Sequence, residues 1–345
     1  MTMIGTILTA ALAAQGPVAA PATPLFADDT PIAISIQGPL GEIARSAERS
    51  SPPRPGVLAI AGTTGTLPVR LSPRGITRRK SETCSFPPLR VEFAPSSAAG
   101  SLFAGQRRLK LVTHCQPSDG FQQQLLLEYS AYRLFNLIDP VSFRARLASI
   151  DYSEGEGRKA VRRFGFFIED LDDIARRNGI ADARVGVRIN SAELDPRHAA
   201  RVALFEYMIG NIDWSMHAGP PGDECCHNVR LLTAVPGRPP YIALAYDFDY
   251  SGLVDAPYAV PPEGVNVTSV RQRIYRGYCR TNNQLLAAAA EFRAKRPELE
   301  AVYSSITGMS ARTRSKAVSY LAGFFKDIAT DDAIRAKLFK TCLGG

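Results

Sequence analysis

The stretch FEYMIGNIDWSMHAGPPGDECCHNVRLLTAVPGRPPYIALAYDFDYSG, residues 205–252, decides how this chain is expected to be organised. An apolar run ends just before Asp213, which is typical of a helix that passes into a loop. Val229 to Leu232 and Tyr241 to Ala245 are two short strand candidates with a proline-rich turn between them. The stretch therefore predicts a helix, a loop and a β-hairpin in succession.

Polar side chains with oxygen donors flank these elements. Asp213 follows the helix, Asn228 precedes the first strand, and Asp247 and Asp249 follow the second. An antiparallel hairpin would bring Asn228 and Asp247 side by side at its open end. Their oxygens can hold Mg²⁺ or Mn²⁺, and Asp213 can accept a proton from a hydroxyl group. The alternative is that these residues only cap backbone groups at turns.

The earlier part of the chain is rich in β-strand candidates. Short segments with β-type composition, separated by turn residues, are residues 32–36, 57–60, 67–71, 89–93 and 109–113, and two further strand candidates, near 144–150 and 164–168, follow a helix expected over 121–138. We expect the first third to be mostly antiparallel. Helices are expected over residues 121–138, 195–209, 284–303 and 311–327, and a further helix is expected to begin at Asp170. A β-rich part followed by a mostly helical part predicts an α+β fold.

A second candidate constellation joins a strand to the helix 121–138. Glu128 lies within the apolar face of this helix, where a carboxylate is costly unless it is paired. Lys110 lies in the preceding strand candidate, within reach of the helix. A strand lysine held by a helix glutamate binds the α- and β-phosphates of ATP in kinases. A structural ion pair, or two side chains that both reach solvent, is the alternative.

Two weaker signals accompany this constellation. Arg74, Gly75 and Arg78 form a basic run in which a glycine could approach phosphate oxygens closely. An apolar strand candidate ends at Glu169, where a nucleotide's adenine could be contacted. A surface turn and an ordinary core strand are the respective alternatives.

Composition and charge limit the possible partners. The chain has 345 residues, of which 45% are hydrophobic and 21% charged, so a substantial core is expected. The net charge is +8, but the basic residues are scattered. A nucleic-acid-binding protein more often carries a stripe of them, so no nucleic-acid partner is expected. A mildly basic cleft for a phosphate-bearing ligand and a solvated basic surface both remain open.

The N-terminal sequence indicates export. Residues 1–20 carry no charge and contain a short apolar run followed by small residues, as in a cleavable signal peptide. Residues 21–31 resemble a linker. No later stretch reaches transmembrane length, so stable membrane insertion is not expected. We therefore expect a periplasmic or secreted protein.

The six cysteines support that expectation, because an even number in an exported chain suggests disulfides. Cys84 and Cys115 are a plausible pair. Of the neighbours Cys225 and Cys226, one is expected to reach Cys279. Zinc binding by this neighbouring pair with the adjacent histidine is the alternative.

The segments around Asp213, His227-Asn228 and Tyr246 to Asp249 resemble the catalytic and metal-binding segments of CotH-like spore-coat protein kinases. They are similar, more distantly, to those of HipA-like kinases. The basic run that begins at Arg74 resembles the Arg-Gly loop of the CotH family, and the strand ending before Asp170 is similar to one in that family. This resemblance spans roughly residues 65–255.

The resemblance implies a two-lobed protein-kinase-like fold around an ATP cleft. A β-rich N-lobe would cover residues 32–169 and a mostly helical C-lobe residues 170–345. Asp213 would be the catalytic base. The metal would be bound by Asn228 and Asp247, with Asp249 holding a second ion, while Lys110, partnered by Glu128, would bind phosphate.

The functional hypothesis is therefore an atypical kinase that uses ATP and Mg²⁺ to phosphorylate a hydroxyl group on a protein or small molecule. The sequence does not identify the acceptor. Two alternatives remain. One is a non-catalytic, disulfide-stabilised pseudokinase that acts as a binding module. The other is a metal-dependent phosphohydrolase that uses Asp213, Asp247 and Asp249. The Lys110–Glu128 pair favours the kinase, because a hydrolase does not need it.

Overall fold

The computed structural model of the chain describes residues 19–48, 50–155 and 157–344. The expected signal peptide, residues 1–20, lies outside these ranges except for its last two residues. The predicted linker is only partly extended. Its Leu25 and Phe26 are buried against the β-strands, and the guanidinium groups of Arg144 and Arg146 donate to their carbonyl oxygens.

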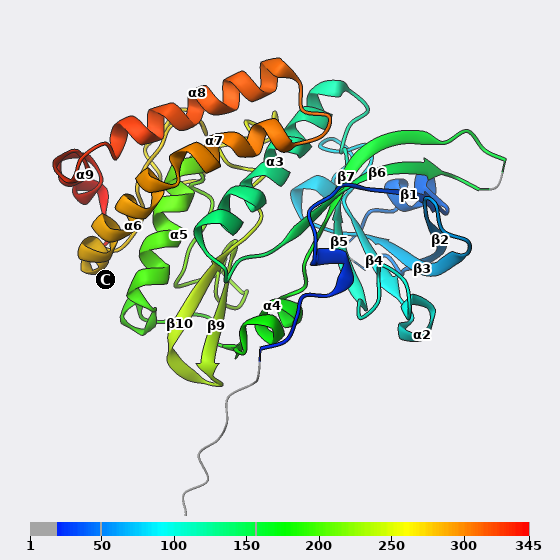
Figure 1. Cartoon of the computed structure of the whole chain (residues 1–345), viewed down its shortest axis with the longest axis horizontal. Helices are drawn as coiled ribbons and strands as arrows, with labels where there is room; N and C mark the ends of the chain where they lie inside the picture. Colours follow the sequence, from blue (N-terminus) through cyan, green and yellow to red (C-terminus); the bar gives the residue numbers. More distant parts are fainter. Residues whose placement is uncertain (1–18, 49, 156, 345) are drawn as a thin grey trace, which may run out of the picture.

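Seven strands of the first half close into a barrel, which lies at the right of Figure 1. Their order around the barrel is β1, β2, β3, β4, β5, β7 and β6. Their bounds are β1 (Ile32–Gln37), β2 (Arg54–Ile60), β3 (Thr66–Pro73), β4 (Leu89–Phe93), β5 (Arg108–Val112), β6 (Ala145–Ser153) and β7 (Val161–Ile168). Alternate side chains point inward and form a separate apolar core.

The expected two-lobed kinase-like fold with a β-sheet N-lobe is wrong, because the strands form a closed mixed barrel. The parallel pairing of β1 with β6, in which Ile34 lies opposite Ile150, closes it. Every other pair in the barrel is antiparallel, as expected. Alternation of apolar residues identifies a strand but not its neighbours, so the closing contact between distant segments could not be read from the sequence. Closure leaves no free sheet edge.

The helix α3 (Asp119–Ile138) lies between the barrel and the helical half (Figure 1). Its apolar face packs against β6 and β7 on one side and against α5 and α7 on the other. Tyr132 and Phe135 are almost fully buried there. This helix therefore fixes Glu128 at the boundary between the two halves.

The second half combines helices with a small sheet. The sheet has the order β10, β9 and β8, formed by β8 (Ala181–Asp182), β9 (Val229–Val235) and β10 (Arg238–Ala245). The longer helices are α4 (Leu171–Asn178), α5 (Pro196–Ile209), α6 (Asn282–Ala294), α7 (Arg296–Ser305), α8 (Ala311–Asp327) and α9 (Asp331–Lys337). Two short helices, α1 (Leu40–Arg45) and α2 (Pro95–Ala98), flank the barrel.

The ends of α5 position the loop that contains Asp213. The Asp195 carboxylate accepts hydrogen bonds from the first backbone N–H groups of α5, as its place before Pro196 predicted. The helix ends at Gly210 in the left-handed conformation, with φ of 65°. A Cβ atom at Gly210 would lie 2.0 Å from the hydroxyl of Tyr320, so the close approach of α8 requires glycine here.

One predicted helix is divided in two. The expected helix over residues 284–303 is interrupted at Lys295, where α6 ends and α7 begins. Pro297 stands in the first turn of α7 and lacks the N–H that a continuous helix would need. The helix expected over 311–327 is confirmed, with the Ser310 hydroxyl accepting from the Thr313 N–H.

One of the two predicted cysteine pairings is confirmed and the other is wrong. The Cys84–Cys115 disulfide is confirmed. Cys279 bonds to Cys342, not to Cys225 or Cys226, because residues 278 and 343 pair side by side as a short β-bridge. The neighbours Cys225 and Cys226 bond to each other. All six thiols are thus consumed, which removes the cysteine ligands of the zinc alternative.

Among the residues placed here, we find no helix that is both long enough and apolar enough to cross a bilayer.

Candidate functional site

The open end of the β9–β10 hairpin brings the predicted site residues together. Ala245 pairs with Val229, and the Tyr246 N–H donates to the Asn228 carbonyl at 3.1 Å. Asn228 and Asp247 therefore meet where the strands end, as the sequence predicted. Both have left-handed backbones, with φ of 50° and 66°. Asparagine and aspartate adopt this conformation more readily than other non-glycine residues, and such strain gathers at functional sites.

Asp213 joins this group through the loop after α5. Its carboxylate accepts a hydrogen bond from His227 Nε2 at 2.7 Å and from Asn228 Nδ2 at 3.1 Å. The same Asn228 amide nitrogen donates to the Asp213 carbonyl at 2.7 Å. The Asn211 side-chain oxygen accepts from the Asp213 N–H at 3.1 Å. Both oxygens of the Asp213 carboxylate are thus oriented, while a quarter of the side chain stays exposed.

The charges around Asp213 favour a protonated histidine. The hydrogen bond to Asp213 raises the pKa of His227, burial opposes this rise, and the negative charges of Asp213 and Asp247 add to it. The charged form of the His227 ring is therefore favoured by its contact with Asp213. The guanidinium of Arg276 donates to the Ile212 carbonyl beside them.

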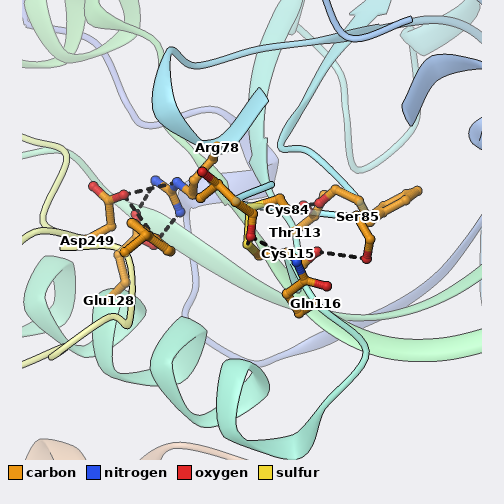
Figure 2. Close-up of a disulfide and its surroundings, with 11 residues drawn as sticks. Arg78, Cys84, Ser85, Thr113, Cys115, Gln116, Glu128 and Asp249 are labelled. Carbon is orange, nitrogen blue, oxygen red and sulfur yellow. Dashed lines mark hydrogen bonds and ion pairs between the residues drawn. A yellow bond between two sulfur atoms is a disulfide. The ribbon is translucent and has the colours of Figure 1, made fainter. Parts of the chain in front are cut away.

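A second cluster surrounds Arg78 (Figure 2). Arg78 Nη1 and Nη2 contact the two carboxylate oxygens of Glu128 at 2.8 and 3.1 Å. Nη2 also lies 3.3 Å from Asp247 Oδ1, and Nε lies 3.1 Å from Asp249 Oδ2. The Arg78, Glu128 and Asp249 side chains are buried, whereas a third of the Asp247 side chain is exposed. Asp247 therefore belongs to both clusters.

The buried carboxylates outnumber the cation that faces them. Burial raises the pKa of Glu128 and of Asp249, and Arg78 opposes the rise in both cases. The Tyr258 hydroxyl donates to Asp249 Oδ2 at 3.1 Å. Oxygens of Glu128, Asp247 and Asp249 lie within 4.8 Å of one another, but Arg78 stands among them.

The expected Lys110–Glu128 ion pair is wrong, because Glu128 pairs with Arg78. The Lys110 amine instead lies over the rings of Tyr246 and Phe143, 4.9 and 5.8 Å from their centroids. Burial lowers the pKa of Lys110 to about 7, and the charge of Arg74 adds to this effect. Lys110 thus lies beside the hairpin end with no carboxylate partner among the described residues.

The basic run is split between two environments. Gly75 is exposed with φ of 93°, and a Cβ there would meet nothing within 4 Å. Arg74 is half-buried, and its charge acts on Lys110, Glu128 and Tyr246. Arg78, in the 3₁₀ turn Thr77–Arg79, has its guanidinium fully engaged by carboxylates. Only the first part of the run is free to meet a ligand.

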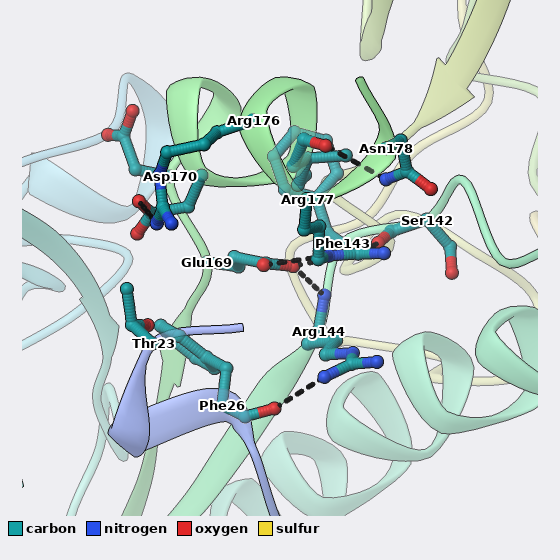
Figure 3. A network of polar contacts seen from close by, with 12 residues as sticks. Thr23, Phe26, Ser142, Phe143, Arg144, Glu169, Asp170, Arg176, Arg177 and Asn178 are labelled. Carbon is teal, nitrogen blue, oxygen red and sulfur yellow. Dashed lines mark hydrogen bonds and ion pairs between the residues drawn. The ribbon is translucent and has the colours of Figure 1, made fainter. Parts of the chain in front are cut away.

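Glu169 serves a structural role (Figure 3). Its carboxylate accepts from Arg177 Nε and Nη2 at 2.9 and 3.1 Å and from the Arg144 N–H at 3.0 Å. Arg177 also donates to the Pro140 carbonyl at 2.8 Å. Because the buried Glu169 carboxylate is satisfied by these donors, it ties the end of β7 to α4 and is not available for a nucleotide.

The donor set at the hairpin end fits a hard cation. Asn228 uses its amide nitrogen toward Asp213, and among the described residues no donor contacts its side-chain oxygen. Asp247, which follows β10 at the same end of the hairpin, offers a partly exposed carboxylate. A divalent cation such as Mg²⁺ takes few protein oxygens and keeps several waters, which suits one amide and one carboxylate oxygen.

Two residues of the site, His227 and Asn211, were not recognised as such from the sequence, and Arg78 was predicted to contact phosphate, not carboxylates. Arg78 pairs with Glu128 across 50 positions, and no spacing rule connects them. His227 orients Asp213, and its position directly before Asn228 was the available signal. Asn211 supports the loop and is fully buried beside Glu206, whose carboxyl pKa burial raises well above its usual range.

Two large cavities lie beside other parts of the fold. One, of about 690 Å³, is lined by residues that include Arg188, His217 and Tyr278. The other, of about 740 Å³, lies between the N-terminal ends of α3 and α8.

A comparison of the sequence with models of known protein families found no match, and a comparison with curated proteins found none either.

Proposed function

We propose that the chain is a phosphotransferase that uses ATP and Mg²⁺ to phosphorylate a hydroxyl group. The observation that carries the proposal is the convergence of Asp213, Asn228 and Asp247 at one end of the β9–β10 hairpin. A carboxylate that can take a proton thus lies beside oxygen donors suited to a hard cation. The proposal rests on this site and requires no kinase-like fold, since similar chemistry recurs on different folds.

Asp213 is the proposed base. Hydrogen bonds from His227 and Asn228 hold its carboxylate in one orientation, and its partial exposure leaves room for an acceptor. Each carboxylate oxygen has two lone pairs, so each can accept a hydrogen bond from an acceptor hydroxyl while it keeps its present hydrogen-bond donor. Asp213 would orient the acceptor hydroxyl and take its proton.

Asn228 and Asp247 are the proposed metal ligands. The side-chain oxygen of Asn228 and the exposed part of the Asp247 carboxylate would hold the ion, with Asp249 as a buried neighbour. When bound, Mg²⁺ offsets the negative charge of the phosphate groups. Arg78 and the Tyr132 hydroxyl, which accepts from the Asp247 N–H at 3.1 Å, hold Asp247 in position.

Lys110 and Arg74 are the proposed phosphate contacts. Both lie near the hairpin end, and their mutual repulsion and the burial of Lys110 make this region favourable for an anion. An arriving phosphate would favour the charged form of the Lys110 amine.

A second candidate function follows from Arg78. Its guanidinium contacts Glu128, Asp247 and Asp249 together and so already supplies a cation to the buried carboxylates. A chain whose acidic cluster is satisfied in this way could instead be a non-catalytic, disulfide-stabilised binding module.

We also propose that the protein is exported. Six of six cysteines are in disulfides, and such bonds persist in oxidising compartments and are rare in the cytosol. Loss of activity under thiol reductant would agree with this assignment, whereas cytosolic accumulation of a fully reduced, active chain would contradict it.

The experiment incubates the purified chain with γ-³²P-labelled ATP and Mg²⁺, with the chain itself and casein as hydroxyl acceptors. We expect labelled protein from the wild type and a loss of about 10²–10⁴-fold in Asp213→Asn, the usual contribution of a general base. Asp223→Asn is the matched control, because Asp223 is an exposed aspartate in the segment between Asp213 and His227.

The other outcomes separate the alternatives. Phosphate release without a labelled acceptor, lost in Asp213→Asn, would replace the transferase by a phosphohydrolase. Binding of ATP without turnover would favour the binding module. Equal labelling by Asp213→Asn and the wild type would refute the role of Asp213.

A further inference from the structure

Arg78 is the point at which the barrel contacts the carboxylates of the site. It lies in the connection between β3 and β4, whereas Glu128 belongs to α3 and Asp247 and Asp249 follow β10. The neighbouring Thr77 adds a second contact, since its hydroxyl oxygen accepts from the Tyr250 hydroxyl at 3.2 Å. This connection thus joins the barrel to the hairpin end, in addition to the contact of Lys110 in β5 with Tyr246.

The guanidinium of Arg78 has no free face for a ligand. All three of its nitrogens lie within 3.3 Å of a carboxylate oxygen, and the residue is 7% exposed. This geometry requires the planar fork of arginine, because a lysine amine cannot reach three carboxylates from one point in the same way. Arg78 therefore serves its carboxylate neighbours and not the phosphate of a nucleotide.

The connection that carries Arg78 is anchored by a disulfide (Figure 2). Cys84, six positions after Arg78, bonds to Cys115, which follows β5, and both are almost fully buried. The bond between the Cys84 N–H and the Lys80 carbonyl, 3.0 Å, links this anchor to the turn that contains Arg78. The Gln116 amide donates to the Thr83 carbonyl at 2.9 Å and reinforces the attachment.

Besides the disulfide, the segment between β3 and β4 is held by its contacts with the acidic cluster and by the bridge between Phe86 and Cys115, in which the Phe86 N–H donates to the Cys115 carbonyl at 3.0 Å. A connection of this length has many alternative conformations, and a covalent bond near its middle removes most of them. The disulfide lies on the barrel side, so it fixes the loop without touching the carboxylates.

We propose that Arg78 is a positioning residue for Asp247 and Asp249, and that the Cys84–Cys115 disulfide holds Arg78 in place. The positioning part rests on the proposed function, because the positioned carboxylates matter as the surroundings of the metal and nucleotide. The anchoring part concerns the chain alone and can be measured with no nucleotide present.

Anchoring is tested by labelling arginines with phenylglyoxal and locating the modified residues by peptide mass spectrometry. We compare the wild type, Cys84→Ser/Cys115→Ser and the matched control Cys279→Ser/Cys342→Ser, which lacks the other long-range disulfide. Arg146 and Arg177 are buried internal controls. We expect Arg78 to be labelled at least about tenfold faster in Cys84→Ser/Cys115→Ser than in the wild type, as local opening predicts, and at the wild-type rate in Cys279→Ser/Cys342→Ser.

Unchanged protection of Arg78 in Cys84→Ser/Cys115→Ser would overturn the anchoring. Faster labelling of Arg78, Arg146 and Arg177 alike would report global unfolding of Cys84→Ser/Cys115→Ser. In that case Cys84→Ala/Cys115→Val is used in its place, because apolar side chains fill the buried site without a covalent bond. In this second variant, selective labelling of Arg78 supports the anchor, and uniform protection or uniform labelling contradicts it.

Positioning is tested with Arg78→Lys, which keeps the charge, and Lys80→Gln as an exposed control from the same turn. We expect the Mg²⁺ concentration that half-saturates ATP binding to rise at least about tenfold in Arg78→Lys, with binding restored at high Mg²⁺. A loss that high Mg²⁺ does not restore would contradict positioning. If the wild type binds no ATP, the proposed function and the positioning part fail together, while the labelling still decides the anchoring part.

Discussion

The two clusters that meet at Asp247 have opposite physical properties. At the hairpin end, Asp213, His227 and Asp247 keep a quarter to a third of their side chains exposed, and hydrogen bonds orient them. Around Arg78, the Glu128 and Asp249 carboxylates are buried and held by one guanidinium. Solvent reaches the first cluster and is largely excluded from the second. The buried cluster holds Asp247 on one side, and the other side of its carboxylate stays exposed.

The largest expected effect tests the buried cluster. Arg78→Met would leave Glu128 and Asp249 buried with no counter-ion, and removal of one partner from a buried pair typically costs about 3–5 kcal/mol. We expect this loss in the free energy of unfolding, measured by urea denaturation at pH 7.5.

The matched control is Arg162→Met, which breaks the exposed pair between Arg162 and Asp151. Exposed pairs contribute about 0–1 kcal/mol. Burial raises the pKa of Glu128 and Asp249, so the deficit of Arg78→Met should shrink at pH 5, where these carboxyl groups become protonated more readily. Equal losses in the two variants would mean that the Arg78 cluster is no more important than a surface pair.

The next effect concerns Lys110, whose amine lies over the Tyr246 ring beside the hairpin end. Burial lowers its pKa in the folded state to about 7, below its value of about 10.4 in an unfolded chain. Between these values the unfolded state binds more protons, so the wild type should gain stability relative to Lys110→Met as the pH rises. The gain is at most about 1.4 kcal/mol per pH unit.

Urea denaturation of both proteins from pH 6.5 to 9.5 measures this gain. No gain over this pH range would mean that the Lys110 amine is held in its charged form, as in the ion pair with Glu128 expected from the sequence, because both states would then stay protonated. This comparison therefore sharpens the assignment of Glu128 to Arg78.

The smallest expected change in activity concerns the hydrogen bond from His227 that orients the Asp213 carboxylate. His227→Gln removes the charged donor but retains an amide that can hydrogen-bond, so we expect about a tenfold loss of phosphate transfer against a larger loss in Asp213→Asn. His198→Gln is the control, because His198 pairs with Asp139 elsewhere. A loss in His227→Gln as large as that in Asp213→Asn would make the histidine itself a catalytic group.

The parts of the fold that the sequence predicted are those with local causes. The strands from β1 to β7, the cap of α5 and the β9–β10 hairpin follow from alternation, an aspartate before a proline and turn residues. The hairpin in turn placed Asn228 beside Asp247, because register is a local property of two adjacent strands.

The errors arose where distant segments meet. The parallel β1–β6 pair closes the barrel, and neither strand carries a mark that identifies the other. Glu128 needed a cation, as its apolar surroundings predicted, but Lys110 and Arg78 were equally available, and the path of the β3–β4 connection decided between them. The pairing of Cys279 likewise depended on where the C-terminal segment packs.

We propose that Asp247 links a buried support to an exposed site for ATP and Mg²⁺. Isothermal titration of ATP in Mg²⁺ into the wild type, Asp247→Asn and the exposed control Asp223→Asn tests it most directly. We expect the wild type and Asp223→Asn to bind ATP, and the affinity of Asp247→Asn to be at least about tenfold weaker. Equal affinity in all three proteins, or no binding by the wild type, would contradict it.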